Sequence, residues 1–152
     1  VAPAIERARA DARQLVVIDV GGDDAGASAL GRFAGIIAQG GYQMLYVVNR
    51  FRALTQAPRE AIGVLRDIEG ACRLHATGVV DNSHLMGDTT TGSIEEGARF
   101  ACEVAREAGL PLVAQVVAKR FADAGACALA RANDGACLYA IEPYRQATWG
   151  NE

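Results

Sequence analysis

The chain contains a single lysine, Lys119, among its 152 residues, and this scarcity excludes one activity at once. A phosphate-binding P-loop needs a lysine directly after its glycines, in the form Gly-Lys-Thr or Gly-Lys-Ser. Lys119 instead follows Val117 and Ala118, with no glycine before it. The sequence therefore lacks a Walker A loop, and we expect this chain by itself not to hydrolyse a nucleotide.

Signals for metal clusters, membranes and nucleic acids are also missing. The four cysteines stand at least ten residues apart, so no Cys-x-x-Cys pair supports a zinc or iron–sulfur site. Fifteen basic against eighteen acidic residues give a net charge of −3, which argues against electrostatic nucleic-acid binding. No apolar run reaches the roughly 18 residues of a membrane span. With no secretory signal at its start, we expect a cytoplasmic protein.

The residues that are present predict a folded α/β domain. Apolar residues make up 51% of the chain and charged residues 22%, which is enough apolar content for a hydrophobic core. Short β-branched runs alternate with longer amphipathic stretches, as in successive βαβ units. We expect strands at residues 15–18, 44–48, 78–80, 112–117 and 138–141. We expect helices at residues 1–13, 25–39, 58–74, 94–108 and 121–132, the fourth capped by Ser93 with Glu96.

This alternation predicts a three-layer, Rossmann-like or P-loop NTPase-like fold. Right-handed βαβ units give a mostly parallel sheet, here of about five strands with helices on both faces. We expect residues 1–142 to form a single α/β domain and residues 143–152 a polar tail. Ligands of such sheets bind beyond the carboxyl ends of the strands. Candidate site residues are therefore those that directly follow each predicted strand.

Two of these strand ends carry short motifs. The first predicted strand ends in Asp19-Val20-Gly21-Gly22, a D-x-x-G pattern. A carboxylate at a strand tip can hold Mg²⁺ through water, and a glycine lets a backbone N–H approach a phosphate. The third ends in Asp81 and Asn82, and a side-chain amide offers both a donor and an acceptor to a base edge. A capped strand end and a simple turn are the structural alternatives for these motifs.

The order and separation of the two motifs resemble those of the MinD/ParA (CobQ/CobB/MinD/ParA) family of deviant Walker P-loop ATPases. The resemblance covers about residues 15–117. It implies that Asp19 associates with Mg²⁺ through water, that Gly22 senses the terminal phosphate, and that Asn82 reads the adenine of ATP. Asp81 is the neighbouring candidate for the base. Lys119 and Arg120 match a loop that helps to enclose the base.

The chain departs from that family in one element, the lysine-containing Walker A loop. We expect the chain to be the carboxyl-terminal part of a larger nucleotide-binding protein, whose Walker A segment precedes Val1. No catalytic residue is expected within the chain itself. In the family the Walker A strand lies beside the Walker B strand, so its absence leaves a gap or free sheet edges. The resemblance further implies ATP and Mg²⁺ as cofactors, a homodimer, and a partner protein that receives the signal of the switch region.

Two other readings of the sequence explain the missing loop without further chain. One is a non-catalytic, Rossmann-like ligand-binding or protein-interaction module, with a small anionic ligand near Arg50, Arg52 and Arg120. The other is a flavodoxin-like or receiver-like domain, and Asp81 matches the phosphoacceptor of a receiver by position. No acidic pair follows the first predicted strand, however, and Lys119 follows the fourth predicted strand rather than the fifth.

Overall fold

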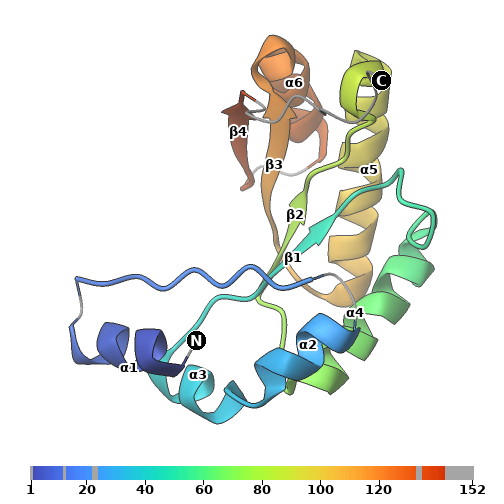
Figure 1. Ribbon diagram of the computed structural model, residues 1–152. Coiled ribbons are helices and arrows are strands. Elements are labelled where there is room, and N and C mark those ends of the chain that lie inside the picture. Colours follow the sequence, from blue (N-terminus) through green and yellow to red (C-terminus); the bar gives the residue numbers. More distant parts are fainter. Residues whose placement is uncertain (1, 12, 22–23, 133–134, 143–152) are drawn as a thin grey trace, which may run out of the picture.

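The computed structural model describes residues 2–11, 13–21, 24–132 and 135–142 (Figure 1). Its centre is a four-stranded sheet in the order β1-β2-β3-β4, with every neighbouring pair parallel. The strands are β1 (Leu45–Val48), β2 (Gly78–Asp81), β3 (Leu112–Ala118) and β4 (Cys137–Ile141). The predicted α/β class with a parallel sheet is confirmed, although the described residues form four strands rather than about five. The predicted polar tail lies outside the described residues.

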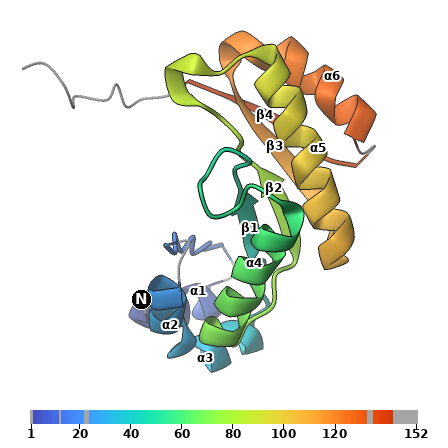
Figure 2. The same cartoon turned by 90° about the vertical axis from the view of Figure 1, so that its right-hand side faces the viewer.

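Three crossover helices connect the strands: α4 (Pro58–Cys72), α5 (Thr91–Ala108) and α6 (Ala122–Ala132). Because the strands follow one another in sequence order and such crossovers are right-handed, these helices share one face of the sheet. Figures 1 and 2 show them along the strands. The Tyr46 hydroxyl donates to the Ala61 carbonyl at 2.9 Å and ties β1 to α4. We call this side the α4–α6 face.

Helices α1 (Ala2–Ala10), α2 (Asp24–Gly31) and α3 (Ala34–Gly40) form a second group. α2 contacts α4, and α1 contacts α3. Figure 1 shows this group below and to the left of the strands and α5 to their right, so helices flank the sheet on both sides. Apolar side chains from α2, α4 and α5 meet those of β1 and β2 in the main core.

The sheet face opposite α4–α6, called the second face here, keeps apolar side chains partly exposed. Strand alternation sends Tyr46 and Val48 into the core and turns Leu45 and Val47 to the second face, where they are 47% and 56% exposed. Tyr139 on β4 is 56% exposed. A shallow hollow of about 310 Å³ lies on this face, and Leu45, Val80 and Tyr139 contribute to its lining.

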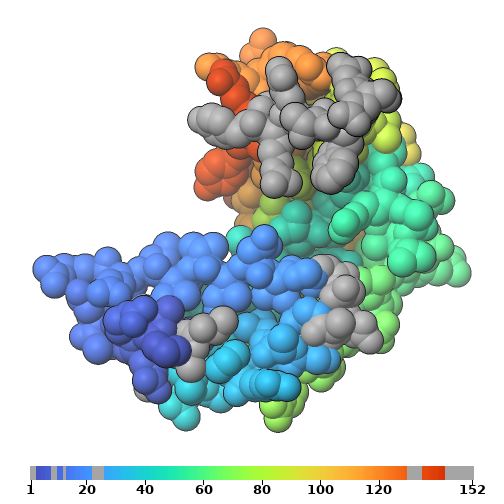
Figure 3. Space-filling view, viewed as in Figure 1, coloured from blue at the N-terminus to red at the C-terminus, as the bar shows by residue number. Residues whose placement is uncertain are grey.

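The predicted strand at residues 15–18 is wrong. Residues 14–21 run extended but join no strand, and Leu15 and Val17 are 88% and 82% exposed. The segment lies at the surface in the space-filling view (blue, Figure 3). A β-branched run forms a strand only where a neighbouring strand satisfies its backbone groups. Among the described strands, none pairs with this run.

The predicted helix at residues 25–39 is also corrected, because it divides into α2 and α3 near Phe33. The Arg73 guanidinium donates to the Gly31 carbonyl, which in a continuous helix would accept from the Gly35 N–H. Phe33 N–H instead donates to Leu30 O at 2.8 Å, a tighter turn. A tertiary contact from the end of α4 thus interrupts a helix that local spacing predicted.

Helix α5 begins three residues before its predicted start. Thr90 is the N-cap: Ser93 N–H donates to Thr90 Oγ1 at 3.2 Å, and Thr90 N–H donates to Ser93 Oγ at 2.9 Å. The expected capping pair of Ser93 with Glu96 is therefore wrong. Glu96 forms an ion pair with Arg50 instead, with Arg50 Nε 3.2 Å from Glu96 Oε1. The helix start is set locally, because Thr90 and Ser93 cap each other, and this leaves the Glu96 side chain to pair with Arg50.

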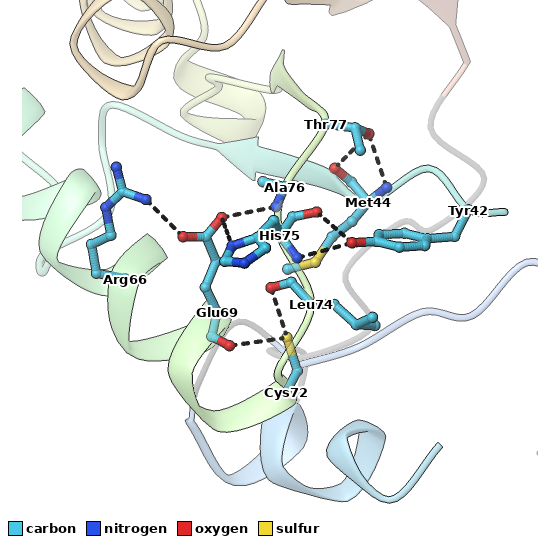
Figure 4. Close-up of polar contacts among 9 residues, drawn as sticks. All are labelled: Tyr42, Met44, Arg66, Glu69, Cys72, Leu74, His75, Ala76 and Thr77. Atoms are coloured by element: carbon cyan, nitrogen blue, oxygen red, sulfur yellow. Dashed lines mark hydrogen bonds and ion pairs between the residues drawn. The ribbon is translucent and has the colours of Figure 1, made fainter. Parts of the chain in front are cut away.

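A polar cluster closes the amino-terminal side of β1 and β2 (Figure 4). Glu69, which is only 8% exposed, accepts from Ala76 N–H at 2.9 Å and from Arg66 Nη1 at 2.8 Å. The Tyr42 hydroxyl accepts from His75 N–H at 3.0 Å and donates to His75 O at 3.3 Å. These bonds satisfy the backbone between α4 and β2. The cluster lies at the opposite end of the strands from the predicted site.

Candidate functional site

The carboxyl edge of the sheet gathers polar residues from three adjacent strands. Asn49 and Arg50 follow β1, Asn82 and Ser83 follow β2, and the short helix η2 (Lys119–Phe121) follows β3. Because all the strands are parallel, these ends meet at one edge. Asn82 and Lys119 therefore lie at the ends of two neighbouring strands, β2 and β3, although they are 37 positions apart in the sequence.

The loops after β1 and β2 are tied to each other through Asn49. Its Oδ1 accepts from Phe51 N–H at 3.0 Å and from His84 N–H at 3.4 Å, while its Nδ2 donates to His84 O at 3.4 Å. Asn82 N–H continues the sheet ladder by donating to Val48 O at 2.9 Å. These bonds satisfy both loops internally and make them one structural unit. Asn49 directly follows a predicted strand, as expected of a candidate site residue, but its role in joining the two loops was not predicted.

Asp81 lies beneath this unit and is 1% exposed. Its Oδ1 accepts from Ser83 N–H at 2.9 Å, and its Oδ2 accepts from Gln115 Nε2 at 2.9 Å. Burial raises the pKa of the Asp81 carboxyl above its usual 3.8, because desolvation penalises the charged form more than the bonds from Ser83 and Gln115 favour it. Protein groups therefore occupy both oxygens of this predicted ligand contact.

Ser83 and Arg50 connect the same loops to helix α5. Ser83 Oγ accepts from Arg50 N–H at 3.0 Å. The Arg50 guanidinium, paired with Glu96, also lies 5.8 Å from the centre of the Phe100 ring. A Cβ on Gly97 would stand 2.3 Å from Ser83 Cβ, so only glycine permits this approach of α5 to the loop. Arg50 is consequently directed toward α5.

Asn82 differs from its neighbours in being half-buried with an uncommitted side chain. It directly follows Asp81, the last residue of β2, which is paired with Val48 in the sheet register. Its side-chain amide makes no hydrogen bond to any other described residue, whereas Asn49, Asp81 and Ser83 are all bonded within the protein. An amide in this position can donate to and accept from a ligand at the carboxyl edge.

Lys119 and Arg120 are exposed at the end of β3. Lys119 Nζ lies 3.2 Å from Glu142 Oε1, with both side chains well exposed, so the pair contributes little to stability. The Arg120 guanidinium lies 4.8 Å from the centre of the Phe121 ring. Their exposure leaves both cations accessible to an anionic or aromatic ligand.

The first predicted motif lies apart from this edge. Gly22 is outside the described residues. Asp19 is exposed on the extended segment and contributes to a hollow of about 210 Å³ together with Leu30 and Phe33. No hydrogen bond or ion pair among the described residues joins Asp19 to Asn82, Lys119 or Arg120. The described part of the chain therefore shows no bonded connection between the two predicted motifs.

The described side chains supply too few ligands to hold Mg²⁺ without water and a bound nucleotide. Residues with defined positions include no cluster of three or more His, Cys, Asp or Glu side chains that could hold a metal ion. Magnesium usually keeps several waters and takes one or two carboxylates together with substrate phosphates. Asp19 can supply one such carboxylate, and the remaining ligands have to come from water and a nucleotide.

Gln115 is a residue of this region that the sequence reasoning missed. It is 1% exposed in the middle of β3, beside Asp81 in the sheet register. A signal for it does exist, because Gln115 is the one polar residue within the apolar run 112–118. A polar residue on the covered face of a strand requires an internal partner, and Asp81 supplies it.

Comparison of the chain with protein-family models, with curated proteins and with solved structures found no significant match in any of the three. Within the described residues, no helix is both long and apolar enough to cross a membrane.

Proposed function

We propose that this chain is the carboxyl-terminal part of a MinD/ParA-like, ATP-binding protein, and that Asn82 reads the base. One observation carries the proposal: a half-buried amide without a hydrogen-bond partner among the described residues lies at the carboxyl edge of a parallel sheet. Ligands of open α/β sheets bind at that edge. In this proposal Lys119 and Arg120, which follow the adjacent strand, border the base or ribose.

The remaining roles follow from the family resemblance. Asp19 associates with Mg²⁺ through water, and Gly22 approaches the terminal phosphate. A segment that carries the lysine loop has to come from further chain or from a partner. Support for this need comes from the unpaired β-branched run with Leu15 and Val17, and from the exposed apolar side chains of the second face. Both features are typical of surfaces that another part of an assembly covers.

The test begins with the codons upstream of Val1 in the source gene, which are expected to encode a Gly-Lys-Thr or Gly-Lys-Ser loop. The longer product is then titrated with Mg-ATP by calorimetry. Asn82→Ala is expected to weaken binding about tenfold, the equivalent of about 1.4 kcal/mol. Gln43→Ala removes an exposed amide at the opposite end of β1 and is the matched control. Equal affinities in the wild type and Asn82→Ala would refute the assignment of Asn82.

The alternative is a non-catalytic interaction module. Exposed apolar side chains at the tips of the two edge loops favour it, because Leu54 is 80% and Met86 77% exposed. The ion pair of Arg50 with Glu96 counts against an anion site at Arg50, since it already compensates that charge. Arg52 and Arg120 are the exposed arginines left for such a site. Binding of inorganic phosphate without a preference for ATP, together with a start codon directly before Val1, supports the module.

A further inference from the structure

Asp81 and Gln115 form a buried polar pair within an otherwise apolar layer. The two residues are neighbours in the register of β2 and β3, and both side chains are 1% exposed. Around them on the α4–α6 face lie apolar side chains such as Val79, Leu112 and Ile94, each at most 3% exposed. Replacing a buried polar pair by apolar residues of similar volume is often neutral or stabilising. Stability alone therefore does not account for this pair.

The pair holds the peptide that carries Asn82. Asp81 Oδ1 accepts the Ser83 N–H at 2.9 Å, an Asx-type turn that bends the chain directly after β2. Asn82 N–H donates to Val48 O at 2.9 Å, so one ladder bond and one side-chain bond secure successive backbone amides. Gln115 Nε2 in turn donates to Asp81 Oδ2 at 2.9 Å and fixes the carboxylate plane.

The bonding continues across the sheet. Ser83 Oγ accepts the Arg50 N–H at 3.0 Å, so the contacts run from β3 through β2 to the loop after β1. Helix α5 packs against these loops, and its Gly97 approaches Ser83 too closely for any larger residue at that position. Ser83 is thus hydrogen-bonded on each side and packed against α5, and these contacts restrain the position of the adjacent Asn82.

Gln115 acts as a donor in this arrangement. Its Nε2 also lies 3.5 Å from Ile94 O, while Gln115 Oε1 is the one buried side-chain oxygen or nitrogen of the described residues that lacks a partner. An unpaired buried acceptor costs stability, roughly 1–3 kcal/mol. The Gln115 amide thus supplies the donor that orients the Asp81 carboxyl, while its own oxygen has no hydrogen-bond partner among the described residues.

We infer that Asp81 and Gln115 are positioning residues, which hold the Asn82–Ser83 peptide so that the Asn82 amide is presented to the ligand at the carboxyl edge. The inference reassigns Asp81 from a ligand contact to a support of its neighbour. It rests on the proposed function for the identity of the ligand, but its geometric content stands on the buried contacts alone.

The test combines one readout of geometry with one of binding. Gln115→Met keeps an unbranched side chain of similar volume and removes the donor. Asp81→Asn keeps the acceptor for Ser83 N–H, whereas Asp81→Leu removes it. Glu69→Gln, at the buried cluster on the opposite end of the strands, is the matched control. The full chain of each variant is examined by NMR for the side-chain amide shifts of Asn82 and the hydrogen exchange of Ser83 N–H, and its melting temperature is measured.

Gln115→Met and Asp81→Leu are expected to shift the Asn82 signals and to accelerate Ser83 exchange at least tenfold, while Asp81→Asn retains slow exchange. Glu69→Gln is expected to lower the melting temperature without either change. Unchanged Asn82 shifts and Ser83 exchange in folded Gln115→Met would overturn the inference, and this variant decides the matter if Asp81→Leu does not fold.

Mg-ATP titration of the longer product separates the two proposals. If the NMR readouts respond but the wild type binds no ATP, the proposed function fails and the positioning role stands. If ATP binding depends on Asn82 but is unchanged in Gln115→Met, the positioning role fails and the proposed function stands. A fivefold or greater loss of affinity in Gln115→Met, with near wild-type affinity in Asp81→Asn, supports both.

Discussion

Gly97→Ala tests the close approach of α5 to the edge loops most directly. A Cβ at this position would lie 2.3 Å from Ser83 Cβ, 2.7 Å from Ser83 Oγ and 3.4 Å from Asp81 Oδ1. Rotation of the Ser83 side chain relieves the contact with Oγ but leaves Cβ where it is. Ser83 is 5% exposed and bonded on both sides, so either the helix or the loop has to move.

The magnitude follows from two opposing effects. Overpacking of a well-packed interior costs typically 1–3 kcal/mol, and a contact that rotation cannot relieve belongs at the upper end. Gly→Ala inside a helix stabilises by about 1 kcal/mol through helix propensity. We therefore expect a net destabilisation of about 2 kcal/mol. For a chain of this size that lowers the melting temperature by roughly 4–8 °C.

The assay is urea and thermal unfolding of Gly97→Ala beside Gly63→Ala. Gly63 lies in α4, is exposed, and has no atom within 4 Å of an added Cβ, so this control isolates the propensity effect. Gly63→Ala is expected to stabilise the chain by about 0.5–1 kcal/mol. If Gly97→Ala proves as stable as the wild type or more so, the close approach of α5 to Ser83 is refuted.

Two further predictions concern charge and packing. Because burial raises the pKa of Asp81 above 3.8, the folded chain binds a proton that the unfolded chain releases, and the free energy of unfolding should fall as pH rises above 3.8 toward the raised pKa. Asp81→Asn should remove this part of the pH dependence in urea titrations from pH 4 to 8; an unchanged pH profile would contradict it. Leu65→Ala empties a fully buried position of α4 and should cost about 2–5 kcal/mol. Leu54→Ala, at an 80% exposed position, should cost less than about 0.5 kcal/mol, and similar unfolding midpoints for the two would contradict the packing.

Local patterns predicted most of the fold. The β-branched runs that became β1 to β4 and the amphipathic stretches that became α4, α5 and α6 agree with the structure within a few residues. They succeed because each element's apolar period matches the face that it buries. The same reasoning predicted the parallel sheet from the alternation of strands and helices, while a site at its carboxyl edge stays a prediction. Membership in the MinD/ParA family and the nucleotide itself remain predictions.

The failures have three different causes. Residues 15–18 have strand-forming composition, yet a strand needs a neighbour for its backbone, and composition does not reveal whether that neighbour exists. The predicted cap at Ser93 gave way to a second local pair, Thr90 with Ser93, which starts the helix three residues earlier. The continuous helix at residues 25–39 is interrupted where Arg73, from a distant position in the chain, donates to the Gly31 carbonyl.

The sequence by itself determined the alternation of elements, the parallel sheet and the absence of a lysine loop, because these depend on residue type and spacing along the chain. Only the tertiary structure decided which polar groups are left for a ligand. It places Asp81 against Gln115 and Ser83 beneath α5, turns Arg50 toward Glu96, and leaves the Asn82 amide uncommitted at the edge. Burial and hydrogen-bond partners arise from residues far apart in sequence, so residue type and spacing along the chain do not reveal them.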